Sequence, residues 1–240
     1  PKVDADAYKE TGEKLKTEII PSYFYPAIDT DNPLIPKFTP EGLEYGNYSA
    51  EEFERLFIRS FGQTAIEPEN LTAEDNTLHE IEYIAPVIEE KDEQKSVCFV
   101  GYIFINEAGQ KWKDWEKIKG DIKEIFVGGE RKYGFGRLNL DNLHSQDSVG
   151  DFFGYKVVDT STGSFTIPKD KPIPAHLPTK DNPSLKGDIE PLVGREWGTG
   201  ENGKVGFGQK VSNAEICWVP GSVLTTGETL KLGEYGRLSK

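Results

Sequence analysis

The stretch GGERKYGFGRL, Gly128 to Leu138, holds four glycines, three cations and two aromatic rings in eleven positions. Its glycines are Gly128, Gly129, Gly134 and Gly136. Glycine adopts positive φ without a steric penalty and lets another backbone come close. Successive backbone N–H groups in such a loop can form a concavity that binds anions. The stretch therefore predicts either a shaped binding loop or a simple turn.

Cations and aromatic rings fill the positions between and beside those glycines. Arg131, Lys132 and Arg137 would supply charge-assisted hydrogen bonds to phosphate groups. Tyr133 or Phe135 could stack on a base. The alternative is a glycine turn whose rings are buried and whose cations are solvated. Residue chemistry favours neither interpretation, and it leaves open which ring stacks and which one packs.

The segments around the loop predict its place in the fold. SVCFVGYIFI, residues 96–105, is an apolar run typical of a central strand. Downstream, large apolar residues recur every three or four positions and predict an amphipathic helix. These residues are Trp112, Trp115, Ile118, Ile122 and Ile125. YGFGRLNL, 133–140, then begins another strand.

The predicted order is thus strand, helix, glycine loop, strand. Dinucleotide-binding glycine loops instead follow a strand and open a helix, so that pyrophosphate meets the helix N-terminus. No Walker A lysine pattern occurs in the sequence either. Both kinds of nucleotide site are therefore disfavoured, and we expect no cofactor.

Upstream, SAEEFERLFIRSF predicts a helix that begins after Ser49. Ser49 and Glu52 have the spacing of a capping box. Four large apolar residues fall on one helical face, which is typical of core packing. They are Phe53, Leu56, Phe57 and Phe61.

A strand is predicted next, from the alternation of Leu78, Ile81, Tyr83 and Ile84. The acidic run EEKDEQK that follows indicates an exposed loop. This loop would join the strand to 96–105 as a hairpin.

The other segments set the predicted domain organisation. Residues 1–48 contain several prolines and favour extended segments and loops. Residues 142–191 are polar and proline-rich and favour a long loop-rich insertion over the surface. Residues 192–240 return to strand-like runs separated by glycine turns. With 240 residues, 25 glycines and 15 prolines, we expect a loop-rich, β-containing chain of one large domain or two small ones.

The net charge of −13 argues against indiscriminate nucleic-acid binding, which needs cations that face phosphates. Residues 111–137, however, hold eight cations against five anions. A small basic site on an acidic body suits a subunit docked among basic partners, and it suits an ordinary acidic protein equally well.

The sequence shows no membrane span and no signal peptide, so we expect a soluble, cytoplasmic protein. Cys98 and Cys217 lie in apolar runs, where buried reduced thiols are favoured over a single disulfide. The chain lacks methionine and begins with proline, which indicates either a removed initiator or a piece of a longer chain.

Candidate catalytic and metal-binding residues are few. His79, His144 and His176 lie far apart, and without an HExxH or CxxC motif we expect no metal site. His79 could act as a general base, but a half-exposed strand histidine is the favoured interpretation. Asp29 and Asp31 could bind a divalent metal or cleave RNA, but a turn-forming pair is favoured.

Several fragments, taken in order, resemble one family. IFVGGERKYGFGRLNL, 125–140, resembles the glycine-rich loop of the RAMP superfamily, the ferredoxin-like RNA-binding proteins of CRISPR–Cas effector complexes. QTAIEPENLTAEDNTLHEIEYI, 63–84, resembles the family segment that leads into a core strand. Its matching residues are Thr64, Ala65, Ile66, Thr72, Ala73 and Leu78. The closing WVPGSVL and LGEYGRL resemble the tails of type III RAMP subunits.

The resemblance implies an α+β, ferredoxin-like (RRM-like) fold with an antiparallel sheet and packed helices. Residues 49–141 would form its core with the glycine-rich loop, and 192–240 would complete the domain. The chain departs from the family pattern at two places. No first strand is evident before Pro21, and the 142–191 insertion has no counterpart in the family.

The resemblance also implies a structural subunit of a type III CRISPR effector complex. Such a subunit holds CRISPR RNA by its backbone, meets target RNA indirectly, and contacts other CRISPR-associated subunits but no membrane. The RNA-binding residues would be Gly128, Gly129, Arg131, Lys132, Tyr133, Gly134, Phe135, Gly136 and Arg137. Two alternatives stay open, namely a metal-dependent endoribonuclease that uses Asp29 or Asp31, and an acidic protein-interaction module.

Overall fold

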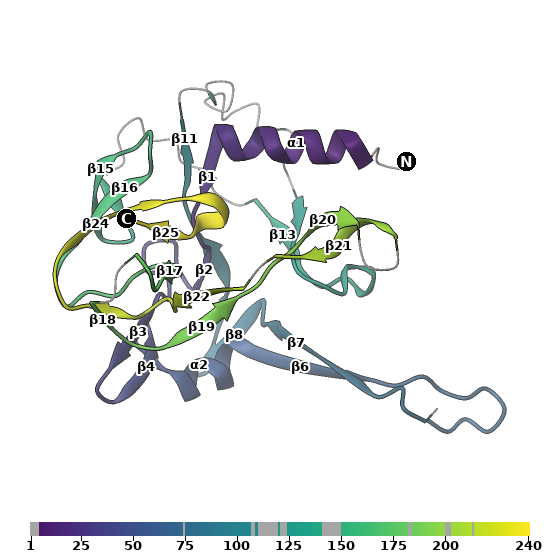
Figure 1. Ribbon diagram of the computed structural model, residues 1–240. Coiled ribbons are helices and arrows are strands. Elements are labelled where there is room, and N and C mark those ends of the chain that lie inside the picture. Colours follow the sequence, from purple (N-terminus) through teal and green to yellow (C-terminus); the bar gives the residue numbers. More distant parts are fainter. Residues whose placement is uncertain are drawn as a thin grey trace.

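The computed structural model describes residues 5–73, 75–106, 109, 120, 124–140, 150–181, 184–199, 203–212 and 214–240. Within them, two α-helices accompany many short antiparallel strands (Figure 1). The α+β class is therefore confirmed, and its ferredoxin-like arrangement stays a prediction. The helix expected over 112–125 lies almost wholly outside the described residues. Its last position, Ile125, belongs to a strand.

The N-terminal segment is not extended throughout, contrary to the sequence-based prediction. Helix α1 (Ala5–Glu18) continues directly into strand β1 (Ile19–Pro21). The prolines that suggested loops begin only at Pro21, and the lysines and glutamates before it are good helix formers. The extended character of 1–48 therefore holds only beyond the helix.

The predicted central strand 96–105 is two short strands with N-terminal partners. β10 (Cys98–Val100) pairs with β2 (Tyr25–Ala27), and β11 (Ile103–Ile105) pairs with β1. The break falls at Gly101, where an added Cβ would lie 2.6 Å from the Phe24 ring. The expected hairpin between 78–84 and 96–105 is therefore wrong.

Helix α2 (Ala50–Phe57) begins at the predicted capping box. The Ser49 hydroxyl accepts from the Glu52 amide at 3.2 Å, and the Glu52 carboxylate accepts from the Ser49 amide at 3.0 Å. Leu56 and Phe57 are buried with Leu34, Ala85 and Ile88. The helix ends before the expected Phe61, because the Phe57 carbonyl accepts a hydrogen bond from the Ala85 amide instead.

Strand β6 (Ile58–Gln63) follows α2 directly and pairs with β7 (His79–Ile84). Phe61 therefore lies on a strand and is 49% exposed, not on the buried helix face. Figure 1 shows this hairpin projecting away from the rest of the chain. The acidic run predicted as a loop is mostly the hairpin of β8 (Val87–Glu90) and β9 (Glu93–Ser96).

The main hydrophobic core involves the segment predicted to be a surface insertion. A five-stranded antiparallel sheet has the order β14-β15-β16-β24-β25. Its strands are Asp151–Phe152, Tyr155–Asp159, Ser164–Ile167, Glu228–Leu232 and Leu238–Ser239. Phe165, Ile167, Ile173, Ala175 and Leu177 are almost fully buried beside it. Phe165 and Ile167 alternate along β16, whereas all residues from Ile173 to Pro178 are buried in a row, prolines included. The described part of 142–191 therefore contributes to the core, and its predicted place on the surface is wrong.

Glycine-punctuated strands also form the remaining small sheets. β17 (Leu177–Pro178), β22 (Glu215–Trp218) and β19 (Ile189–Leu192) make one sheet in that order. Two further sheets are strand pairs, β18 (Leu185–Lys186) with β23 (Val223–Leu224) and β20 (Arg195–Thr199) with β21 (Val205–Val211). An N-terminal meander consists of β3 (Pro36–Thr39), β4 (Gly42–Tyr45) and β5 (Tyr48–Ser49). The strand prediction for 192–240 is confirmed. Among the described residues, neither helix has the length and apolarity that crossing a membrane requires.

Candidate nucleic-acid interface

The glycine loop closes a β-hairpin. Strands β12 (Glu124–Phe126) and β13 (Arg137–Asn139) pair antiparallel, and the Val127 amide donates to the Gly136 carbonyl at 2.9 Å. A strand therefore precedes the loop directly, where the sequence predicted a helix. The loop is followed by a strand as expected, so the objection to a dinucleotide site still holds.

Three of the four loop glycines have positive φ, namely Gly128 at +72°, Gly134 and Gly136, whereas Gly129 does not. Gly136 has φ +71°, and an added Cβ would lie 1.8 Å from the Val127 carbonyl oxygen. Gly134 has φ +90° and ends a short 3-10 turn over Arg131–Tyr133. Both conformations are costly for residues with a side chain. The loop shape is thus encoded by its glycines, as the sequence indicated.

The three loop cations differ in their surroundings. Arg131 donates from Nε to the Gly128 carbonyl at 3.1 Å, which leaves its terminal nitrogens facing solvent. Lys132 is exposed, and no carboxylate pairs with either side chain within the described part of the chain. Arg137 instead forms an ion pair with Glu124 on the partner strand. Two of the three predicted phosphate ligands are therefore unpaired within the described residues, and the third has a competing carboxylate.

The two aromatic residues of the loop lie in different environments. Phe135 is half-buried, and its ring centroid lies 5.1 Å from that of Tyr83 and 6.4 Å from that of Phe61. Tyr133 is 61% exposed. Phe135 is thus the ring that packs, and Tyr133 is the ring that remains available for stacking on a base.

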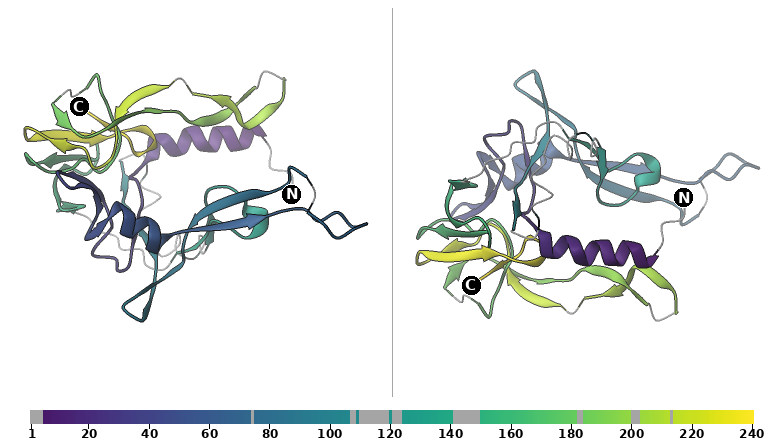
Figure 2. Two further views of the ribbon diagram at one scale, coloured as in Figure 1. Left: turned by 90° about the horizontal axis from the view of Figure 1, so that it is seen from below. Right: turned by 90° about the horizontal axis from the view of Figure 1, so that it is seen from above.

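Phe135 places the loop on one particular face of the β6–β7 hairpin. Arg59 pairs with Tyr83, and Phe61 pairs with Ile81, so the side chains of these four residues lie on one face of the hairpin. Phe135 contacts that face through Tyr83 and Phe61. Glu80 and Glu82 alternate to the opposite face. Figure 2 shows the loop beside this hairpin. The carboxylates of β7 are therefore directed away from the face that Phe135 contacts. Arg59 shares that face, and its Nη1 donates to the Arg55 carbonyl at 3.3 Å.

The remaining candidate residues do not converge on a catalytic arrangement. Oδ1 of Asp29 accepts from the Asp31 amide at 3.0 Å and from the Asn32 amide at 2.9 Å, which is the favoured turn. His79 is exposed on β7, and its Nδ1 lies 3.1 Å from the Thr77 carbonyl oxygen. The described residues include no cluster of three or more metal-ligating side chains. His144 lies outside the described residues.

The cysteines and the third histidine belong to the body of the protein. Cys98 and Cys217 do not form a disulfide; Cys217 is buried, as predicted, and Cys98 is half-buried. Burial raises the pKa of Cys217. His176 is buried, with Nδ1 2.8 Å from the Tyr23 hydroxyl and Nε2 2.6 Å from Glu190. These contacts give His176 a structural role.

Comparison with known proteins gives structural matches alone. No family model and no curated protein matches the chain. One similar solved structure is a chain of "Cryo-EM structure of the Type III-B Cmr-beta bound to cognate target RNA", with 14% identity, a TM-score of 0.43, and coverage of 86% of this chain and 65% of that chain. A second is a chain of the Type III-B Cmr-beta complex "bound to cognate target RNA and AMPPnP, state 1", with 13% identity, a TM-score of 0.43, and coverage of 86% and 66%. The chain thus spans slightly less than two thirds of each of these two chains.

Proposed function

We propose that this chain is a structural RNA-binding subunit of a type III CRISPR effector complex. It holds CRISPR RNA through the sugar–phosphate backbone, meets target RNA indirectly through base pairing, and contacts other subunits of the complex. The resemblance of 63–84 and 125–140 to the RAMP pattern motivates the family, and the geometry of the glycine loop supports the binding mode.

The observation that carries the proposal is the set of side chains that the loop presents. Arg131 and Lys132 are exposed and unpaired within the described residues, and Tyr133 is exposed beside them. Phosphate recognition needs cations, and base stacking needs a free aromatic face. Packing of Phe135 holds the loop in place, so that little order is lost on binding.

An acidic protein can bind RNA in this way when its charges are segregated. Glu80 and Glu82 lie on the far face of the β6–β7 hairpin, and Arg59 lies on the near face. Local potential, more than net charge, then determines where the phosphates bind. The turn geometry of Asp29 favours its structural interpretation over a ribonuclease role.

The test measures affinity of the full chain for a fluorescently labelled, unstructured single-stranded RNA of about a dozen nucleotides. We expect the double substitution Arg131→Ala and Lys132→Ala to weaken binding about tenfold near physiological salt, because two phosphate contacts are lost. The slope of log affinity against log salt becomes shallower by about 1.4 for the same reason.

The matched control is Lys169→Ala with Lys171→Ala, which removes the same charge from an exposed turn beyond the loop. An equal loss of affinity in both double variants would mean that net charge alone matters. The CRISPR context is tested separately, by sequencing RNA that copurifies with the native assembly. Repeat-derived guide sequences support the proposal, and their absence contradicts it.

A further inference from the structure

A second candidate site lies away from the glycine loop, between the N-terminal strands β2, β3 and β4 and the C-terminal strands β19 and β22. It is a groove of about 530 Å³. Strands β2, β3 and β4 supply one wall, with the rings of Tyr25, Phe38 and Tyr45. The beginning of β19 and the residues after β22 supply the other wall. The proposed RNA-binding role does not use this groove.

Two carboxylate side chains line the second wall of the groove. Asp188 and Glu190 both line the groove and are exposed. The Asp188 carboxylate has no hydrogen-bond or ion-pair partner within the described part of the chain, and Glu190 uses one oxygen to meet His176. None of the described residues that line the groove carries a positive charge. The groove is therefore both aromatic and anionic.

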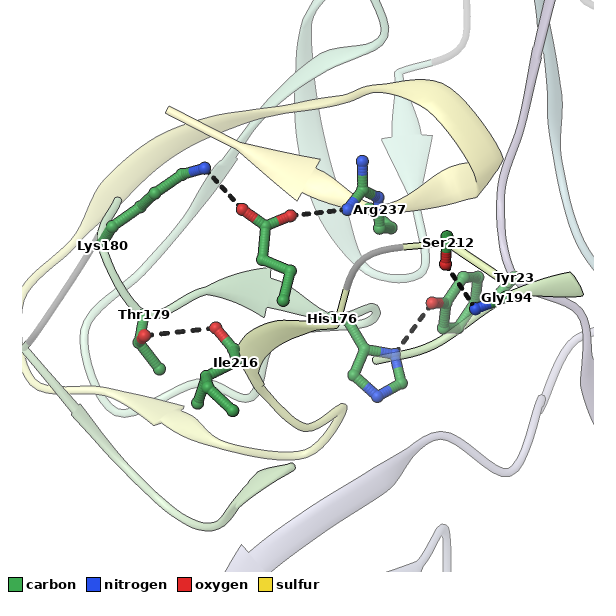
Figure 3. A network of polar contacts seen from close by, with 9 residues as sticks. Tyr23, His176, Thr179, Lys180, Gly194, Ser212, Ile216 and Arg237 are labelled. Carbon is green, nitrogen blue, oxygen red and sulfur yellow. Dashed lines mark hydrogen bonds and ion pairs between the residues drawn. The ribbon is translucent and has the colours of Figure 1, made fainter. Parts of the chain in front are cut away.

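The aromatic wall is held rigidly. The Tyr25 hydroxyl donates to the Pro174 carbonyl at 2.5 Å, and the Tyr23 hydroxyl lies 2.8 Å from Nδ1 of His176 (Figure 3). Burial raises the pKa of both phenols, that of Tyr23 to about 12. The phenols therefore stay neutral. Tyr25 is only 8% exposed and supports the wall from behind, whereas Tyr23, Phe38 and Tyr45 are half-buried rings that line the groove.

We propose that this groove binds an arginine side chain carried by an extended segment of a neighbouring protein chain. A cation over aromatic rings is attracted by their quadrupoles. A planar guanidinium also stacks on rings and forms paired hydrogen bonds with carboxylates, which an ammonium group cannot do. Asp188, Ile189 and Glu190 of the second wall are all exposed, so an arginine side chain carried by another protein chain can reach the groove.

The experiment uses the full chain, labelled with ¹⁵N, and short peptides that differ only at their central residue. That residue is arginine, lysine, citrulline or glutamate. Citrulline keeps the shape of arginine and removes its charge. We expect the arginine peptide to give saturable shifts of backbone signals around Phe38 and Ile189. The citrulline peptide binds about tenfold more weakly, and the lysine peptide lies between them.

Variants assign the effect to the two carboxylates. Asp188→Asn with Glu190→Gln should weaken binding of the arginine peptide about tenfold, since two partly exposed charge contacts are lost. Asp188→Asn alone leaves the Glu190–His176 contact intact and should give about a threefold loss. The control, Glu80→Gln with Glu82→Gln, removes the same charge from β7.

Three results would overturn the proposal. These are equal binding of the arginine and citrulline peptides, equal loss in the groove and control variants, and the absence of saturable shifts with the arginine peptide. Stronger binding of the glutamate or citrulline peptide would assign the groove to an apolar or polar partner instead.

Discussion

The Tyr23 hydroxyl lies 2.8 Å from Nδ1 of His176, and the two rings meet edge to face with centroids 5.6 Å apart (Figure 3). Nε2 of His176 lies 2.6 Å from the Glu190 carboxylate. With the pKa of Tyr23 raised to about 12, mainly by burial, the phenol is the natural donor to Nδ1. Nε2–H then donates to Glu190, so that the imidazole is fully satisfied. These contacts join the segment between β1 and β2, which carries Tyr23, to β19, which carries Glu190.

Tyr23→Phe tests how much that junction contributes. The substitution keeps the ring and leaves Nδ1 of a buried imidazole without its donor. We expect the free energy of unfolding to fall by about 1 to 3 kcal/mol, the usual cost of an unsatisfied buried group. Urea denaturation measures it, with the exposed Tyr133→Phe as the control. A loss no larger than in the control would mean that the contact does not stabilise the fold.

Local signals in the sequence were sufficient for some elements. The capping box at Ser49 and Glu52 predicted where α2 begins, because both groups lie within one turn. Alternation predicted β7, and the glycine pattern predicted a loop shaped by glycines, three of which, Gly128, Gly134 and Gly136, have positive φ. In each case the residues that decide the structure are neighbours in the chain.

Distant contacts decided what the sequence could not predict. The end of α2 depends on a hydrogen bond from Ala85, and the split of 96–105 depends on Phe24 at Gly101. Burial of Phe165 and Ile167 requires β24, which lies more than sixty positions later. The roles of Tyr133 and Phe135 likewise follow from β6 and β7, so residue chemistry alone left them undivided.

Gly136→Ala tests the shape of the glycine loop. The new Cβ would meet the Val127 carbonyl oxygen in a backbone with φ +71°, so we expect the β12–β13 hairpin to open. The strain of a left-handed alanine alone is about 1 to 2 kcal/mol. Hydrogen exchange at the Val127 amide should accelerate about tenfold or more, and RNA affinity should fall with it.

Gly129→Ala is the matched control, because no atom lies within 4 Å of its added Cβ and its φ is not positive. It should leave exchange of the Val127 amide unchanged, so that any effect of Gly129→Ala on RNA affinity would come from the binding surface and not from the loop shape. Identical behaviour of the two variants would show that Gly136 does not determine the loop shape.

The two loop aromatics should respond differently to truncation. Tyr133→Ala removes an exposed ring, so we expect stability to change by less than about 0.5 kcal/mol. Affinity for single-stranded RNA should fall by about 1 to 3 kcal/mol, the value of one base–aromatic stack. Parallel thermal denaturation and anisotropy titrations measure the two quantities. Unaltered RNA affinity would remove Tyr133 from the interface.

Phe135→Ala should instead weaken the docking of the loop on β6–β7. The lost contacts with Tyr83 and Phe61 are each worth about 0.5 to 1.5 kcal/mol beyond the area that they bury. We expect faster hydrogen exchange in β12 and β13 and an indirect loss of RNA affinity, which Phe135→Leu should partly restore. Full loss of binding with unchanged exchange would mean that Phe135, too, contacts RNA.

Glu215 gives the fold a pH dependence. Its carboxylate bridges Lys180 and Arg237, the latter at 2.7 Å, and the contact with Lys180 is the main reason that its pKa is lowered (Figure 3). A lowered carboxyl pKa adds stability above the unfolded value, about 4.3 for glutamate, and loses it as pH falls through the folded value. Nε of Arg237 is buried and has no hydrogen-bond partner within the described residues. Glu215, which accepts from Nη1, is therefore the group that offsets the positive charge of Arg237.

Glu215→Gln should therefore lower the free energy of unfolding by about 1 kcal/mol at neutral pH, since the pair is partly exposed and screened. The difference from the wild type should shrink below about pH 4, because protonation removes the same charge from the wild-type carboxyl. Urea denaturation across this range measures the effect. Glu41→Gln, an exposed turn residue, is the control and should show no such convergence. A difference that persists undiminished in acid would assign the loss to packing, not to charge.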